Sequence, residues 1–200
     1  MAVAALDWFA VARARRPLEY LAKPLTLVLL IGVALSLDPA EVAVRAAVVV
    51  ALVFSLAGDV ALVVPAERWF VVGLASFLVA HLAYVAAFWL EGVALGALLA
   101  GVVVVAVAVL VLGRRIVMAV SRGPESDLVG PVAVYIGVIS LMVASAVGTR
   151  QGLVVAGAAL FYTSDALIAW TRFIRDFRHG RLAVMVTYHV AQILLVLSLV

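Results

Sequence analysis

The segment WFVVGLASFLVAHLAYVAAFWL, residues 69–90, decides the fold class of this chain, because its 22 positions include no Asp, Glu, Lys or Arg. One α-helix needs about 20 such residues to cross a bilayer. Three further stretches are equally free of charged residues, at 92–113, 128–149 and 182–200. Two more carry a single acid each, Asp59 within 46–66 and Asp165 within 151–171.

A seventh apolar stretch runs from about Leu18 to Leu37, with Glu19 and Lys23 near its start, where long side chains reach the membrane interface. Hydrophobic residues make up 68% of the chain and charged residues only 12%, whereas a soluble domain is about half apolar and a quarter charged. We therefore predict an all-α polytopic membrane bundle of about seven transmembrane helices, forming a single domain over residues 18–200.

Basic residues gather on one side of the membrane when the predicted spans alternate in direction. Twelve of the fourteen Lys and Arg residues lie near the N-terminus or in the segments 65–68, 113–127 and 172–181, and only Arg45 and Arg150 lie on the other side. This asymmetry predicts a cytoplasmic position for the Arg-rich side and a C-terminus outside. Anionic lipid headgroups, rather than nucleic acid, are the partners that such a face favours. The excess of Arg over Lys is typical of GC-rich bacterial genomes, so we expect a bacterial inner membrane.

Two acids stand inside the apolar spans, Asp59 in SLAGDVALVV (55–64) and Asp165 in FYTSDALIAW (161–170). Their spans run in the same direction, and a rise of ~1.5 Å per residue places both about 10 Å inside the cytoplasmic boundary. A charged acid in the bilayer costs roughly 2.5–3.5 kcal/mol and usually faces the bundle interior. We expect the two acids to converge on one site. The alternative is a pair of acids that only holds helices together by hydrogen bonds.

Other polar side chains occur at similar depth and are candidates to support the acids. Ser55 lies one turn before Asp59, Tyr135 lies four residues after Pro131, and Lys23 precedes Pro24 at the start of its span. Further candidates share helix faces at spacings of three or four residues, namely His81 with Tyr84 and Tyr188 with Gln192.

The stretch 92–113 has no polar group of this kind, so we predict a peripheral, lipid-facing helix. Gly92 and Gly96 in it form a GxxxG, which favours close helix packing.

Six short motifs occur in order along the chain: KPLTLVLL from Lys23, SLAGDVALVV, FLVAHLAYVAAF, PVAVYIGVISLMVASA, GAALFYTSDALIA and YHVAQILL. With them the chain resembles the YhhN-like lysoplasmalogenase family of integral membrane enzymes, over about residues 23–198. That family usually has eight spans, the first of which would precede the Arg13–Arg16 cluster. Residues 1–17 are therefore interpreted as an N-terminal cytoplasmic segment or the remnant of a first helix. His189 is not part of the resemblance.

The resemblance implies hydrolysis of the vinyl ether bond of lysoplasmalogens, lysophospholipids that would yield a fatty aldehyde and a glycerophospho-headgroup. It implies Asp59 and Asp165 as the catalytic pair, adds Ser164 to the supporting residues, and requires no metal or organic cofactor. A vinyl ether hydrolyses by protonation at carbon, so one carboxyl must be protonated and a second group must activate water. Burial and mutual proximity separate two carboxyls into such roles. We expect the substrate to enter from the cytoplasmic leaflet, with its chain running past Phe77 or Phe88.

Three other classes of protein fit the same residues. A proton-coupled transporter also places paired acids in a helical bundle. A metal hydrolase would use His81, His189, Asp59 and Asp165 as ligands. A lipid-binding or scaffold protein without activity is the third. The sequence leaves the oligomeric state and the headgroup preference open.

Overall fold

A computed structural model describes residues 2–38, 41–63 and 67–200. Within these ranges the chain is almost entirely helical and has no strand. The helices are α1 (Ala2–Ala12), α2 (Arg16–Ser36), α3 (Val42–Val63), α4 (Glu67–Glu91), α5 (Leu95–Ala108), α6 (Arg114–Arg122), α7 (Val129–Thr149), α8 (Gly152–Phe173) and α9 (Gly180–Leu197). Seven helical segments in the described part are long and apolar enough to cross a membrane. The predicted all-α polytopic bundle is confirmed.

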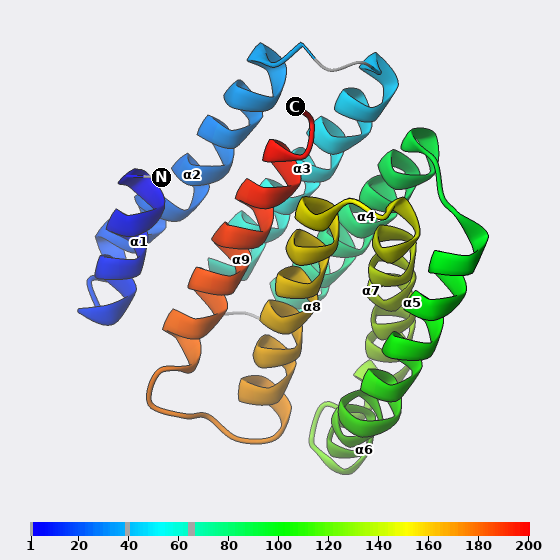
Figure 1. Ribbon diagram of the computed structural model, residues 1–200. Coiled ribbons are helices and arrows are strands. Elements are labelled where there is room, and N and C mark those ends of the chain that lie inside the picture. Colours follow the sequence, from blue (N-terminus) through cyan, green and yellow to red (C-terminus); the bar gives the residue numbers. More distant parts are fainter. Residues whose placement is uncertain (1, 39–40, 64–66) are drawn as a thin grey trace.

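The helices stand side by side in one bundle (Figure 1). Packing joins α3 to α4, α8 to α9 and α5 to α7, while α4 also packs on α7. The α2–α3 connection and the C-terminus lie at one end of the bundle, and α6 and the α8–α9 connection lie at the other. The Arg-rich segments 114–122 and 172–181 thus share an end, as the predicted topology requires. The predicted loop 65–68 falls partly outside the described residues.

The fourth predicted span differs from the structure in where it ends. We expected a loop from 113 to 127, but the chain passes from α5 through a π-helical segment, Val109–Gly113, directly into α6. The apolar side chains of Ile116 and Val120 are buried, while Arg114 and Arg115 lie on other faces of the helix. An amphipathic pattern of this kind continues a helix where a count of charged residues predicts a loop.

The helix α5 lies at the edge of the bundle, as its lack of polar residues predicted. Leu95 and Val103 are 69% and 65% exposed, and Leu110 in the π-helical segment that follows is 70% exposed. The predicted packing role of the GxxxG is wrong, because no atom of another helix in the described part lies within 4 Å of a Cβ placed on Gly92 or Gly96. Instead α5 approaches α7 at Gly101, where an added Cβ would lie 2.9 Å from the Cα of Ala144.

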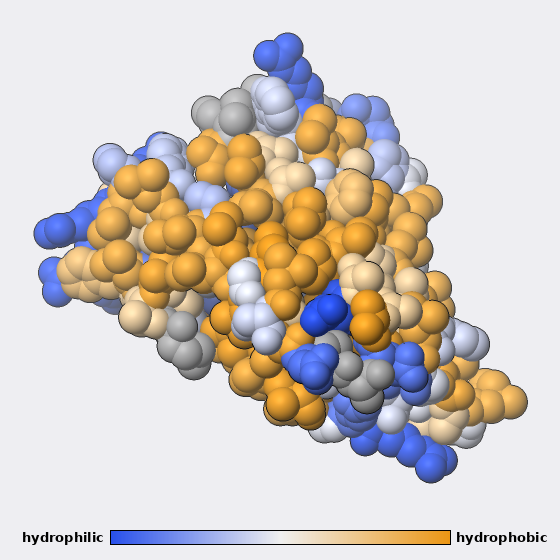
Figure 2. Space-filling model, turned by 90° about the horizontal axis from the view of Figure 1, so that it is seen from above, coloured by the Kyte–Doolittle hydropathy of each residue, from blue (hydrophilic) through white to orange (hydrophobic). Residues whose placement is uncertain are grey.

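Hydrophobic residues cover much of the face seen from above in Figure 2, and hydrophilic residues form separate groups on it. On α2 the exposed apolar side chains include Leu21, Leu25, Val28 and Leu29, all more than 40% exposed. Such an apolar exterior suits lipid as the surrounding medium. Residues 1–17, interpreted from the sequence as an N-terminal cytoplasmic segment or the remnant of a first helix, contain the helix α1, which packs against α2 and α9.

Candidate active site

Asp59 is held by side chains from two other helices. The ammonium nitrogen of Lys23 on α2 lies 2.9 Å from Oδ1, and the Tyr188 hydroxyl on α9 donates a hydrogen bond to Oδ2 at 2.8 Å. Asp59 and Lys23 are 1% and 7% exposed, so the pair is shielded from the surroundings. Pro24, which follows Lys23, has no N–H to donate within its helix. The geometry fixes an ion pair at the junction of α2, α3 and α9.

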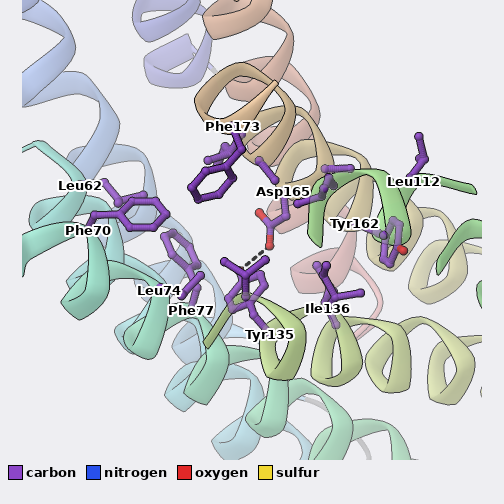
Figure 3. A pocket seen from close by; sticks show the side chains of 17 residues that line it. Leu62, Phe70, Leu74, Phe77, Leu112, Tyr135, Ile136, Tyr162, Asp165 and Phe173 are labelled. Atoms are coloured by element: carbon purple, nitrogen blue, oxygen red, sulfur yellow. Dashed lines mark hydrogen bonds between the residues drawn. The ribbon is translucent and has the colours of Figure 1, made fainter. Parts of the chain in front are cut away.

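Asp165 has a different environment, on α8 and facing a pocket (Figure 3). The Tyr135 hydroxyl from α7 donates to its Oδ2 at 2.5 Å, and Nε2 of His81 from α4 lies 3.6 Å from the same oxygen. Within the described residues no Lys or Arg forms an ion pair with this carboxyl. Its side chain is 11% exposed. Asp165 is therefore the aspartate that a molecule in the pocket meets.

An aromatic layer joins the two aspartates. The ring of Tyr188 packs edge-on against Phe161 at 5.4 Å between centroids, and His81 packs against Phe161 at 4.8 Å and against Tyr135 at 5.3 Å. Phe77 contacts both Phe161 and Tyr188. The acids therefore belong to one continuous cluster of side chains, but no hydrogen bond within the described residues links the two carboxylates directly.

The pocket beside Asp165 is lined almost wholly by apolar side chains. Its walls come from α3, α4, α6, α7, α8 and the π-helical segment, and include Leu62, Phe70, Leu74, Phe77, Ile116, Val132, Ile136 and Phe173. The π-helical segment supplies Leu112 and Gly113 to the wall. Such segments occur frequently at functional sites. The pocket offers an apolar chain a place next to one carboxyl. Phe77 lines it as expected, whereas Phe88 is not among its walls and stacks on Tyr84.

The other predicted supporting residues form no hydrogen bond with either aspartate among the described residues. The Tyr84 hydroxyl donates to Oε1 of Gln192 at 2.5 Å, in the buried interior between α4 and α9. The Ser164 hydroxyl donates to the backbone carbonyl of Val184, which ties α8 to α9 and turns it away from the neighbouring Asp165. Ser55 is fully buried one turn before Asp59 and has no hydrogen-bond partner among the described residues. Of the supporting set, Lys23, His81, Tyr135 and Tyr188 lie next to an aspartate.

His189 lies in a further buried cluster on the far side of α9. Its Nδ1 accepts a hydrogen bond from the Trp8 indole N–H at 3.1 Å, and Oδ2 of Asp7 lies 3.9 Å from the same nitrogen. The two histidines therefore sit with different acids. No group of three or more His, Cys, Asp or Glu side chains in the described part is arranged to hold a metal ion. The four ligands of the metal-hydrolase alternative are not gathered in one place.

Sequence reasoning missed the residues that shape one wall of the pocket. Phe70 on α4 is far in sequence from the neighbouring Arg172 and Phe173 on α8, and none of the three belongs to a motif. They nevertheless meet at this wall, with the Phe70 and Phe173 rings 6.2 Å apart. The apolar pattern of the spans hid the phenylalanines, because every span is rich in such residues. Trp8 and Asp7 were missed for the opposite reason, since residues 1–17 were not assigned to the bundle.

The family comparison agrees with this arrangement, because the model of the YhhN family matches residues 18–199. The chain belongs to the YhhN family. The match includes both aspartates, all the side chains that contact them and the whole pocket. It excludes α1, and with it Asp7 and Trp8.

Two human proteins are similar to the chain over most of its length. Lysoplasmalogenase TMEM86B of Homo sapiens is 40% identical over 149 residues, which cover 74% of this chain and 61% of that protein. Lysoplasmalogenase TMEM86A of Homo sapiens is 35% identical over 166 residues, which cover 76% of this chain and 64% of that protein. The chain thus spans less than two thirds of the length of these relatives. No solved structure matches the chain.

Proposed function

We propose that this protein hydrolyses the vinyl ether bond of lysoplasmalogens within the membrane, by acid–base chemistry at its two aspartates. The observation that carries the proposal is the Asp165 carboxyl, which faces an apolar pocket and accepts a 2.5 Å hydrogen bond from Tyr135. Family membership and relatives named as lysoplasmalogenases support it. The bond to be cleaved joins an apolar chain to a polar headgroup, which suits a site near a membrane boundary.

Asp165 is assigned the acid of the first step. Its proton passes to the outer carbon of the double bond, which forms an oxocarbenium ion and leaves Asp165 as a carboxylate. Water adds to the carbon that carries the oxygen and gives its proton to this carboxylate, so that the acid is restored. The hemiacetal formed then collapses to the aldehyde and the headgroup alcohol, with its hydroxyl proton transferred to the leaving oxygen. Positioned acid–base groups supply about 10²–10⁴-fold in such steps.

Asp59 is assigned the second, ionised aspartate of the pair. A cation 2.9 Å away favours the carboxylate form, and Tyr188 joins this carboxylate to the aromatic layer that reaches His81 and Tyr135. The Asp59–Lys23 pair carries no net charge, so its part is to hold the Tyr188 hydroxyl and with it the aromatic layer beside Asp165. Asp59 does not line the pocket, so we assign it a positioning role and leave proton transfer at carbon to Asp165.

Aldehyde release from the detergent-purified protein tests the proposal. Lysolipids with an alkenyl, an alkyl and an acyl chain should be compared, since only the alkenyl ether has a double bond to protonate. Turnover in D₂O, with the product reduced at once to the alcohol, should place one deuterium on the carbon next to the former carbonyl carbon. Cleavage of acyl lysolipids alone, or substrate-driven proton flux in liposomes without aldehyde, would contradict it.

A further inference from the structure

The side chain of Arg172 lies against two of the aromatic rings that line the Asp165 pocket. The guanidinium carbon lies 3.6 Å from the centroid of the Phe70 ring and 5.6 Å from that of Phe173, and both rings line the pocket (Figure 3). The same guanidinium donates from Nε and Nη2 to the two carboxylate oxygens of Glu125, at 3.1 and 2.6 Å. Arg172 thus joins α4, α8 and the α6–α7 connection at the border of the pocket.

The position of Arg172 along α8 relates it to Asp165. The two residues are seven positions apart, which is two helical turns, or about 10 Å along the axis. Ala169 lies between them and also lines the pocket. In a lysoplasmalogen seven bonds separate the outer vinyl carbon from phosphorus, so the extended distance is about 9 Å, given bonds of about 1.5 Å or less. The helix positions that carry the acid and the guanidinium are thus about as far apart along α8 as the two ends of the headgroup region.

The chemistry of the Arg172 site also suits a phosphate. A guanidinium binds phosphate with two parallel hydrogen bonds, as it now binds the Glu125 carboxylate. The side chains of Arg172 and Glu125 are 29% and 28% exposed, and ion pairs this accessible contribute little net stability. An incoming phosphate therefore displaces the carboxylate at small cost. Lys23, the cation closest to an aspartate, is committed to Asp59 and does not line the pocket.

We propose that Arg172 binds the phosphate of the lysolipid headgroup and that Glu125 occupies the guanidinium until the lipid arrives. The inference rests on the proposed function for the position of the vinyl ether at Asp165. It goes beyond that function by assigning the headgroup site, and it predicts opposite effects for the two members of one ion pair. Loss of Arg172 removes the guanidinium that binds the phosphate. Loss of the Glu125 charge removes the carboxylate that competes with the phosphate for this guanidinium.

Equilibrium binding of saturated ether lipids tests the assignment without any turnover. An alkyl lysophospholipid should be compared with the matching alkylglycerol, which has no phosphate, in the wild type, Arg172→Gln, Glu125→Gln and Arg178→Gln. Arg178 is an exposed arginine of the α8–α9 connection and serves as the matched control. We expect Arg172→Gln to weaken binding of the phospholipid at least tenfold and to leave the alkylglycerol unchanged. Glu125→Gln should bind the phospholipid as tightly as the wild type or more tightly.

A purely structural role of the ion pair predicts a different result. Arg172→Gln and Glu125→Gln would then weaken binding of the phospholipid and of the alkylglycerol to the same extent, and this outcome would overturn the proposal. Arg172→Lys keeps the positive charge but lacks the planar guanidinium that makes two parallel hydrogen bonds, so it should recover only part of the affinity for the phospholipid. If Arg172→Gln does not fold, as judged by thermal unfolding in detergent, Arg172→Lys takes its place. Equal binding of the phospholipid by Arg172→Lys and the wild type would then count against bidentate recognition.

Two further measurements separate the sources of phosphate and the two proposals. Inorganic phosphate at millimolar concentration should not displace the alkyl lysophospholipid; displacement at concentrations equal to those of the lipid would assign the site to free phosphate instead. With the vinyl ether substrate, Arg172→Gln should raise KM about tenfold with kcat little changed. The wild type could release no aldehyde while Arg172→Gln still weakens binding of the phospholipid and not of the alkylglycerol. That result would support the headgroup site and contradict the proposed hydrolysis.

Discussion

The ammonium nitrogen of Lys23 lies 2.9 Å from Oδ1 of Asp59, so one of the two intramembrane aspartates is neutralised by a cation of its own. Asp165 has no such partner among the described residues and meets the pocket with a tyrosine and a histidine beside it. Two acids that look alike in sequence therefore have unlike surroundings. This difference separates their proposed roles and sets the expected effects of the substitutions below.

Replacement of Lys23 by Met should change the stability of the protein and its pH–rate profile rather than the KM. Removal of one member of a buried ion pair leaves an uncompensated charge and costs about 3–5 kcal/mol. Thermal unfolding in detergent measures the loss. The double variant Lys23→Met/Asp59→Asn removes both charges and should regain most of the stability without regaining activity. A raised KM with unchanged stability would instead place Lys23 at the substrate headgroup.

Asp165→Asn should abolish aldehyde release, because an amide cannot donate the proton that the alkenyl carbon needs. The loss should reach about 10²–10⁴-fold. Asp59→Asn should also inactivate the protein, and the double variant should be little worse than Asp165→Asn, since residues that act as a unit are not additive. Single-turnover rates on folded protein measure both effects. Turnover of Asp165→Asn near that of the wild type would remove Asp165 from the mechanism.

The Tyr135 hydroxyl should matter for the rate, and the Tyr84 hydroxyl should not. Tyr135→Phe removes the hydrogen bond to Asp165 but keeps the ring that packs against His81. Hydrogen bonds to charged groups contribute about 1.5–3 kcal/mol, which is tenfold or more in kcat if the bond acts in the transition state. Tyr84→Phe is the matched control, because its hydroxyl bonds to Gln192 away from the pocket. Equal kcat values for the two variants would contradict the role of Tyr135.

Filling the pocket should weaken binding of the lipid chain and leave the acids in place. Ala169 lines the pocket one turn after Asp165, and Ala169→Leu adds three carbons to its wall. We expect KM to rise most for the longest alkenyl chains. Ala156→Leu, at an exposed position of the same helix, is the control. KM values that do not depend on chain length in Ala169→Leu would show that the chain lies elsewhere.

The absence of cysteine from the chain makes the membrane orientation testable by labelling. A single cysteine at position 178 should react with an impermeant thiol reagent only after the cytoplasmic side is opened, since the Arg-rich connections are expected there. A cysteine at position 150, at the other end of the bundle, should react in intact cells. Labelling of 178 from outside would reverse the predicted topology.

The span pattern was readable because each helix must supply about 20 apolar residues to cross the bilayer. The predicted stretch 128–149 corresponds to α7 at Val129–Thr149, and 151–171 to α8 at Gly152–Phe173. The continuation of α5 into α6 was not predicted, since Arg114 and Arg115 interrupt the apolar run without ending the helix. A count of charges locates spans better than it locates helix ends.

The site was harder to predict, because sequence spacing gives the face of a helix but not the neighbour of that face. Asp59 and Asp165 stand out as the only acids inside spans, and Lys23, Tyr135 and Tyr188 were found with them. The resemblance to the family added Ser164, whose hydroxyl bonds to the backbone of Val184. The spacing of glycines suggested the GxxxG, which meets no other helix at Gly96. Rotation of each helix within the bundle decides these outcomes, and packing of large side chains sets that rotation.

The hydrogen bond between Tyr188 and Asp59 joins residues 129 positions apart in the chain. A ribosome delivers α2 and α3, with Lys23 and Asp59, long before α9 emerges. During that interval the carboxylate has Lys23 as a partner but lacks the hydroxyl of Tyr188. The contacts around Asp59 are therefore complete only after α9 has entered the bundle. A chain truncated before α9 cannot form them, although it already carries both members of the buried ion pair.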